Sequence, residues 1–357
     1  MPSFLVETVA RRYEAIVERG ILDRAAAYIP ERAGTAFVVT TADVWRLYGE
    51  RVDRALGARK HEVLFFAGGE ERKRLDEVER LAAEMAARGG ERSSMVVAFG
   101  GGIVTDVGGF LASVFMRGIP VLQIPTTLLA QVDAGIGGKT GVNLREGKNL
   151  IGTFHQPAAV LIDPGVLSTL AAREYTAGLF EVLKHGVIRS PELFRLMAGQ
   201  PEAVRARAPE AVDRMIAESV RIKAEVVSAD EREGDLRRIL NFGHTVGHAL
   251  EAETDYTRFL HGEAVAFGMC AAAHLGRLAG VCNAATCQAI LDAVALYGPL
   301  PPLDGIAAGN LAARLRGDKK TVHGKVHFVL PVEIGAVRIV SGLDETMVLE
   351  AIQAALA

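Results

Sequence analysis

The chain has 357 residues, of which 50% are hydrophobic. Its length exceeds what a single hydrophobic core usually organises, so we expect two domains, 1–166 and 167–357. Its 40 basic and 43 acidic side chains give a net charge of −3 without a long basic run, which argues against a nucleic-acid partner. No segment has the uninterrupted apolar run of a signal peptide or a membrane span, so we expect a cytoplasmic protein without a membrane partner.

Short β-branched runs alternate with amphipathic stretches through the first half of the chain. The strand-like runs are TAFVVT, EVLFFA, MVVAFG, PVLQIP and AAVLID, and the stretches ADVWRLYGERVDRAL and LDEVERLAAEMAARG separate the first three of them. This alternation is typical of βαβ units, so it predicts an α/β domain with a mostly parallel sheet.

The periodicity changes at about Leu167. From there to Arg316, apolar residues recur every three or four positions, which predicts a helical domain. Near the end, HFVLPVEIGAVRIV could form a hairpin that turns at residues 333–335, and MVLEAIQAALA is expected to be the last helix.

Three glycines, Gly100, Gly101 and Gly102, stand where the strand MVVAFG ends and a helix is expected to begin. Glycines there let the backbone approach a ligand, and the amides at a helix start favour a pyrophosphate. The segment is not a GxGxxG motif, so an ordinary strand-to-helix turn is the alternative. Asp106 could bind a ribose or a fixed base, or merely complement the helix N-terminus.

The segment RRILNFGHTVGHALEAE places Arg237, Asn241, His244 and His248 at separations of four, three and four. On one helix these side chains would share one face. Such groups are costly to bury without partners, so the pattern predicts a functional site. The spacing by itself assigns both His244 and His248 to a metal ion.

Two further segments could complete a metal site. AGLFEVLKHGV supplies Glu181, with Lys184 one turn later, and LHGEAVAFG supplies His261. A carboxylate and two imidazoles suit a zinc-like ion that keeps coordination positions for substrate oxygens. For Glu181 and Lys184, an ordinary surface ion pair is the alternative.

Lysines near glycines suggest an anion site. Lys139, Lys148 and Asn149 lie in or just after a segment with five glycines between Gly135 and Gly147. Lysines beside accessible backbone amides suit phosphate or carboxylate groups, although solvated loop lysines are the alternative. Lys223 and the run Asp318 to Lys320 supply further cations, each of which alone is typical of a surface.

Six segments, in the same order along the chain, resemble the motifs of 3-dehydroquinate synthases. They are GGGIVTDVGGFLASVFMRG, IPTTLLAQVDAGIGGKTGVN, GKNLIGTFHQP, EVLKHG, LNFGHTVGHALE and LHGEAVAFG. The resemblance implies a Rossmann-like NAD-binding domain followed by an all-α metal-binding domain, one zinc or cobalt ion, and a homodimer. It also implies conversion of 3-deoxy-D-arabino-heptulosonate 7-phosphate to 3-dehydroquinate and phosphate, through transient oxidation by NAD, phosphate elimination, re-reduction and aldol closure.

The resemblance changes the metal assignment to Glu181, His244 and His261, and leaves His248 beside the substrate. The other implied substrate and catalytic residues are Asp133, Lys139, Asn149, Lys184, Lys223, Arg237, Asn241, Lys319 or Lys320, and Arg117 reaching across the dimer interface. The implied cofactor residues are Gly69, Glu70, Lys73, Gly100, Gly101, Gly102, Asp106, Thr126, Thr127, Lys139, Lys148 and Thr169.

The chain departs from the family pattern at a few positions. Gly68 replaces a usual Asp, Ala134 and Gly135 replace a common Ser pair, and His185 replaces a common Tyr, but none of these is an implied metal ligand. A metal-dependent polyol dehydrogenase of the glycerol dehydrogenase type, another sugar-phosphate cyclase and a non-catalytic NAD-binding protein are the alternatives. The many cations favour a substrate that carries both phosphate and carboxylate.

Overall fold

The computed structural model describes residues 2–317 and 326–357, which form two compact units. The sheet unit comprises Met1–Ala171 and Lys223–Arg232, and the helical unit comprises Ala172–Ile222 and Glu233–Ala357. The expected boundary at residue 166 thus differs from this division, above all in the segment Lys223–Arg232. Within that segment, Ser228 accepts a hydrogen bond from the Glu7 amide, a long-range contact that no local pattern reveals.

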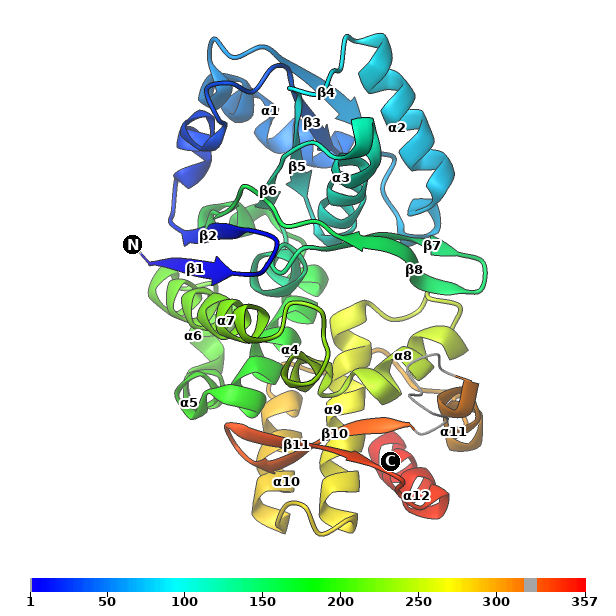
Figure 1. Ribbon diagram of the computed structural model, residues 1–357. Helices are drawn as coiled ribbons and strands as arrows, with labels where there is room; N and C mark the ends of the chain where they lie inside the picture. The colour runs from blue at the N-terminus through cyan, green and yellow to red at the C-terminus, as the bar shows by residue number, and fades with distance from the viewer. Residues whose placement is uncertain (1, 318–325) are drawn as a thin grey trace. The chain divides into compact units, whose positions relative to one another are not determined.

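The sheet unit is built on a mostly parallel sheet, as the alternating strand and helix patterns predict (Figure 1). Within the described residues the sheet has seven strands in the order β1-β2-β9-β6-β5-β3-β4. Only β1 and β2 pair antiparallel, and the pairs from β2 to β4 are parallel. The strands are β1 Ser3–Glu7, β2 Arg12–Val17, β3 Ala36–Thr40, β4 His61–Phe65, β5 Met95–Gly100, β6 Val121–Pro125 and β9 Ala159–Ile162.

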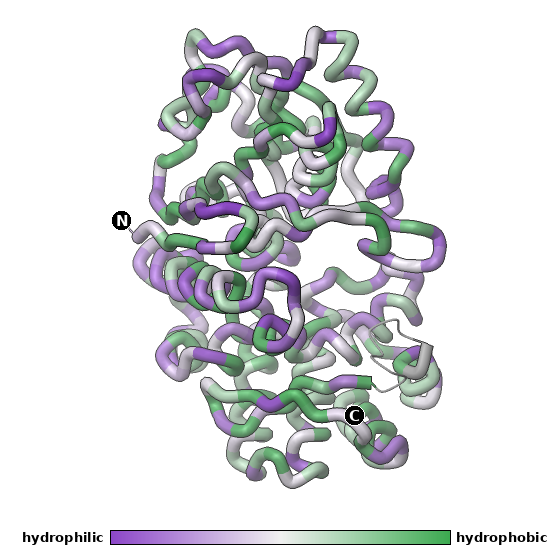
Figure 2. Tube along the Cα trace, in the orientation of Figure 1, coloured by the Kyte–Doolittle hydropathy of each residue, from purple (hydrophilic) through white to green (hydrophobic). Residues whose placement is uncertain are grey.

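Helices cover both faces of this sheet. On β3, Phe37 packs into a core cluster with residues of α2 and α3, whereas Val38 packs into a second cluster with residues of α1 and η1. Burial on both faces explains why the central strands read as continuous apolar runs. Figure 2 shows apolar and polar residues alternating along α2, whose buried face carries Val78, Leu81 and Met85.

The remaining elements of the sheet unit are listed here by their bounds. They are η1 Ile21–Tyr28, α1 Ala42–Leu56, η2 Glu70–Arg72, α2 Leu75–Ala87, α3 Gly102–Val114, η3 Phe115–Arg117, η4 Ala130–Ala134 and η5 Pro164–Thr169. A separate hairpin of β7 Lys139–Leu144 and β8 Gly147–Phe154 occupies the glycine-rich segment, for which no strands were expected.

The helical unit is organised around α9, His261–Leu278, which packs against α4, α8, α10, α12 and β10. It also contains the expected hairpin, which turns between Glu333 and Ala336. Because of these two strands, the domain is mostly helical and not all-α as expected. Its other elements are α4 Ala172–Arg189, α5 Pro191–Gly199, α6 Pro201–Arg205, the start of α7 Pro209–Ala229, η6 Leu236–Asn241, α8 His244–Glu253, α10 Ala284–Ala295, α11 Ala308–Gly317, β10 His327–Glu333, β11 Ala336–Ser341 and α12 Glu345–Leu356.

Candidate active site

Three histidines meet inside the helical unit. His244 and His248 lie on α8, and His261 opens α9. The ring centroid of His244 is 5.3 Å from that of His248 and 5.1 Å from that of His261. Among the described residues, these three are the group of His, Cys, Asp or Glu side chains whose spacing could hold a metal ion, with ligand atoms within 4.8 Å of one another.

Glu181 on α4 adds a fully buried carboxylate to this cluster. Its Oε1 atom lies 3.6 Å from Nε2 of His244 and 3.5 Å from Nε2 of His261. Ligand atoms about 2.0 to 2.1 Å from a tetrahedral zinc ion would be roughly 3.3 Å apart, so these three side chains fit a metal with little adjustment. His248 also lies within reach, and the ligand set therefore stays a prediction.

The Glu181 carboxylate is shared between the histidines and a lysine. Its Oε2 atom is 2.5 Å from Nζ of Lys184, and both side chains are almost completely buried. The alternative of an ordinary surface ion pair is therefore wrong. A buried cation directly beside a metal-type ligand set suits a substrate that carries negative charge.

Glu251 is a residue of this cluster that the sequence motifs did not single out. Its Oε2 atom is 3.3 Å from Nδ1 of His261, and its side chain is buried. Burial acts to lower the pKa of His261, but the carboxylates of Glu251 and Glu181 outweigh it and raise this pKa to about 10. Such a carboxylate fixes the ring so that Nε2 faces a metal. The sequence pattern gave no reason to choose Glu251 over Glu253 as a partner of the histidines, although Glu253 pairs with Arg314 at the surface.

The expected single helix from Arg237 to His248 is wrong. Arg237 and Asn241 belong to η6, and α8 begins only at His244, because Gly243 adopts a left-handed φ of 79°. The break allows close packing against α9, since a Cβ atom on Gly243 would lie 2.7 Å from the carbonyl oxygen of Val265. Arg237 is nevertheless buried, and Asn241 donates a hydrogen bond to Glu233.

The glycine turn of the sheet unit has the expected form, with β5 ending at Gly100 and α3 beginning at Gly102. The Thr126 amide donates to the Gly100 carbonyl at 2.9 Å, and a Cβ atom on Gly101 would lie 3.0 Å from Cγ2 of Thr127. The turn and both threonines thus meet at the carboxyl end of the sheet, where ligands of parallel sheets bind. Thr169 lies in η5 and is hydrogen-bonded to the Tyr48 hydroxyl at 2.7 Å.

Lys73 links two of the other candidate cofactor and substrate residues. Its buried ammonium donates to Oδ2 of Asp106 at 2.5 Å and to Oδ1 of Asn149 at 2.6 Å. Burial raises the pKa of the Asp106 carboxyl, although Lys73 acts in the opposite direction. Asp106 is therefore part of a polar network and does more than complement the α3 dipole. Gly69 and Glu70 lie in the turn just before Lys73.

The remaining candidates are placed as follows. Lys223 is buried and forms an ion pair with Asp133, so residues of distant sequence are joined within the sheet unit. Lys139 pairs with Phe154 at one end of the β7–β8 hairpin, whereas Lys148 follows Gly147 at the other end, so the structure separates these two lysines. Arg117 is exposed on η3, and Lys319 and Lys320 lie outside the described residues.

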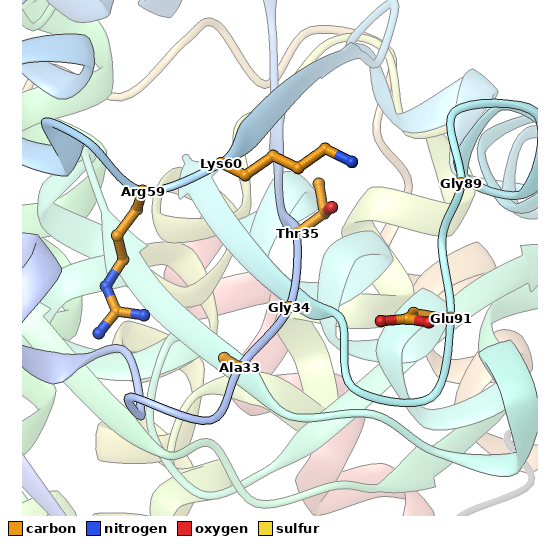
Figure 3. Close-up of a pocket in the computed structure, with 7 residues that line it drawn as sticks. All are labelled: Ala33, Gly34, Thr35, Arg59, Lys60, Gly89 and Glu91. Atoms are coloured by element: carbon orange, nitrogen blue, oxygen red, sulfur yellow. The ribbon is translucent and has the colours of Figure 1, made fainter.

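A cavity of about 470 Å³ lies elsewhere in the sheet unit. Figure 3 shows the residues that line it. Its lining residues Thr35, Lys60 and Glu91 lie before β3, β4 and β5, at the amino ends of these strands. The Arg59 guanidinium in its wall already donates to the carbonyls of Ile29 and Pro30. The glycine turn follows β5 at its opposite end, so this cavity is separate from the candidate cofactor site.

Two family models match the chain. The model described as "3-dehydroquinate synthase N-terminal" matches residues 63–177, and the one described as "3-dehydroquinate synthase C-terminal" matches residues 178–321. A curated 3-dehydroquinate synthase from Solibacter usitatus is 64% identical over 100% of both chains. Another, from Koribacter versatilis, is 50% identical and covers 98% of this chain and 96% of its own.

Solved structures share the fold along nearly the whole chain. ValA, a 2-epi-5-epi-valiolone synthase from Streptomyces hygroscopicus solved with NAD+ and Zn2+ bound, is 32% identical with a TM-score of 0.88 and 96% coverage of both chains. A 2-deoxy-scyllo-inosose synthase complexed with carbaglucose-6-phosphate, NAD+ and Co2+ is 25% identical with a TM-score of 0.90 and 99% coverage of both. A probable glycerol dehydrogenase from Sinorhizobium meliloti, at 19% identity and a TM-score of 0.70 with 96% coverage of both chains, shares the fold alone.

Proposed function

The chain belongs to the 3-dehydroquinate synthase family, and we propose that it uses NAD and one zinc or cobalt ion to convert 3-deoxy-D-arabino-heptulosonate 7-phosphate to 3-dehydroquinate and phosphate. One observation carries the proposal. The buried Glu181 carboxylate faces two imidazoles with one oxygen and a buried lysine with the other. A metal-type ligand set with an adjoining cation is what a charged, metal-held substrate requires.

The metal would be held by Glu181, His244 and His261. When bound, NAD would accept and return a hydride, and the metal would polarise a substrate hydroxyl as a Lewis acid. Lys184 lies against the metal ligands and would stabilise negative charge beside them. His248, whose ring is 5.8 Å from that of His261, would act next to the substrate.

Charged side chains would bind and orient the two acidic groups of the substrate. We assign the substrate carboxylate to Arg237, supported by Asn241, because a buried guanidinium can bind a carboxylate with two parallel hydrogen bonds. Lys139 and Lys223 are assigned to charged substrate groups, including the phosphate. Holding one flexible molecule at several points makes its successive reactions effectively unimolecular.

A neutral-polyol dehydrogenase is the less favoured alternative. Lys184 and Arg237 are buried cations of the same helical unit as the histidine cluster, and they suit a negatively charged substrate better than a small uncharged alcohol. Another sugar-phosphate cyclase is closer in chemistry, and two such cyclases share the fold. The 64% identity along the whole chain to a curated 3-dehydroquinate synthase favours the synthase reaction over both.

We further propose a homodimer with Arg117 at the contact between subunits. Arg117 and Met116 both adopt a positive φ, which presents them on an exposed turn. Val114, Met116 and Phe154 are exposed apolar side chains, and His155 bonds the Ile119 carbonyl, which places Phe154 near this turn. A patch of this kind is typical of a protein interface.

The proposed reaction predicts phosphate release from the heptulosonate phosphate without net accumulation of NADH. Arg237→Met should lower kcat/KM roughly ten- to a hundredfold, because a charge-assisted contact contributes on the order of 1.5 to 3 kcal/mol. NAD affinity should remain nearly unchanged, because Arg237 is assigned to the substrate carboxylate and not to the cofactor. Arg238→Met, at the half-buried neighbouring position, is the matched control and should retain activity.

Steady reduction of NAD with glycerol by the wild-type protein, retained in Arg237→Met, would contradict the synthase assignment. Phosphate release that requires stoichiometric consumption of NAD would contradict the proposed return of the hydride.

A further inference from the structure

Asn143 occupies an irregular position in the β7–β8 hairpin. The strand register passes from Val142, paired with Ile151, directly to Leu144, paired with Gly147, so Asn143 has no regular partner in the ladder. Asn149 lies in the bulged part of β8 and adopts a left-handed φ of 53°. Irregularities of this kind redirect side chains and are frequent beside active sites.

The Asn143 side chain replaces the missing strand pairing with hydrogen bonds of its own. Its Oδ1 atom accepts from the Asn149 amide at 2.8 Å, which holds the left-handed turn. Its Nδ2 atom donates to the Glu70 carbonyl at 3.2 Å and to the Glu70 carboxylate at 2.7 Å. The Asn143 amide donates to the Lys73 carbonyl at 2.7 Å.

These contacts tie together two segments that the proposed function assigns to cofactor and substrate. One is the loop of Gly69, Glu70 and Lys73, and the other is the turn at Lys148 and Asn149. The Lys73 ammonium adds a second link between the two segments, because it donates hydrogen bonds to both Asn149 and Asp106. Asn143 itself is buried, so it holds these residues through hydrogen bonds inside the protein.

We propose that Asn143 is a positioning residue for NAD, acting through Glu70, Lys73 and Asn149. The inference rests on the proposed function, which assigns those residues to cofactor and substrate. A side-chain amide is suited to this place because it donates to Glu70 and accepts from Asn149 at once. Neither a carboxylate nor an apolar side chain of similar size can do both.

Asn143→Asp tests the proposal with little change in shape. The variant keeps an acceptor for the Asn149 amide but loses both donors to Glu70 and places two carboxylates together. We expect roughly tenfold weaker NAD binding, measured by calorimetry on the metal-loaded full-length protein, because the Glu70 oxygens lose a buried partner. Asn143→Leu, which loses both sets of bonds, should weaken NAD binding further.

A Val142→Ala variant is the matched control for loss of stability in the same hairpin. Val142 is buried in the sheet-unit core and its side chain contributes no hydrogen bond, so this variant should lower the melting temperature and leave the NAD dissociation constant within about twofold of wild type. The Glu70→Gln background restores a carboxylate–amide pair with donor and acceptor exchanged. Because Glu70 is itself assigned to the cofactor, this background is the reference, and Asn143→Asp should weaken NAD binding less there than in the wild-type protein.

Several outcomes would overturn the positioning role. These are wild-type NAD affinity in Asn143→Asp, or equal weakening in Val142→Ala at equal loss of melting temperature. If Asn143→Leu does not fold, the Asp variant still decides the question, and equal weakening by Asn143→Asp in the wild-type and Glu70→Gln backgrounds counts against the proposal. Failure of the wild-type protein to bind NAD would instead contradict the proposed function, so the two failures are distinguishable.

Discussion

His248 and His261 have similar surroundings but different geometric relations to the buried carboxylate. His261 lies between Glu181 and Glu251, which contact its two ring nitrogens at 3.5 and 3.3 Å. His248 stacks on the His261 ring at 5.8 Å and belongs to the same imidazole cluster. A histidine held between two carboxylates is oriented more firmly, so we assign it to the metal and His248 to the substrate.

We expect a chelator to abolish turnover and added zinc or cobalt to restore it. His261→Ala should lower the metal content of the purified protein far more than His248→Ala, the matched control, because His261 lies 3.5 Å from the Glu181 carboxylate and is assigned to the metal, whereas His248 is assigned to the substrate. Elemental analysis of both variants checks this expectation. Equal metal contents in the two variants would contradict the assignment of His261, and not His248, to the metal. Full activity of a verified metal-free preparation would show that the reaction needs no metal.

Glu251→Gln should weaken metal binding roughly ten- to a hundredfold, the usual effect of altering a partner that orients a ligating histidine. The amide has nearly the same shape but lacks the charge that favours a cation in this buried cluster. Competition with a metal-binding dye measures the affinity directly. An unchanged affinity would show that packing alone orients His261.

At the scale of elements, the site depends on how closely α8 and α9 approach each other. Gly268 in α9 faces the backbone of Gly243, and a Cβ atom at Gly268 would lie 1.8 Å from the Gly243 carbonyl oxygen. A Cβ atom at Gly247 would lie 2.8 Å from the Ala264 carbonyl oxygen. Because both helices start with a histidine, this approach determines the separation of His244 and His261.

Gly268→Ala should therefore destabilise the protein by about 1 to 3 kcal/mol or more, since the backbone must move to accommodate the methyl group. Gly309→Ala is the control, because no atom lies within 4 Å of its Cβ position in α11. That variant should be stabilised by roughly 0.5 to 1 kcal/mol. Urea denaturation of both proteins checks the two signs, and an unchanged midpoint for Gly268→Ala would contradict the close approach.

At the scale of the whole molecule, the described helices bear on membrane insertion and the exposed surface bears on association. In residues 2–317 and 326–357 the structure shows no helix with the length and apolar character needed to cross a bilayer. The cytoplasmic location and the absence of a nucleic-acid partner stay predictions. The exposed patch of Val114, Met116 and Phe154 is the surface proposed to form the homodimer contact.

Met116→Asp should shift the proposed dimer towards monomer, because it places a charge in an apolar contact. Aspartate tolerates the left-handed backbone of this position, so the fold should persist. Leu47→Asp, at an exposed leucine on α1, is the control and should leave the oligomeric state unchanged. Sedimentation velocity distinguishes the species, and a wild-type monomer would contradict the homodimer itself.

The sequence by itself determined the features that depend on local pattern. Continuous apolar runs such as MVVAFG predicted the buried parallel strands, and the three-and-four spacing after Leu167 predicted the helices, because these periods report which faces are buried. The ordered motifs identified the family, which the matches along the chain confirm. The candidate site residues were named from their spacing and chemistry and from those motifs, without information on their distances.

Only the tertiary structure decided which of those residues meet. Spacing placed Arg237 and His248 on one helix, but packing of Gly243 against α9 broke it. Glu181 reaches two histidines on other helices, and Asn143 joins a loop far earlier in the chain. Contacts between such distant residues depend on how whole elements pack, and the local periodicity of a sequence carries no information about that packing.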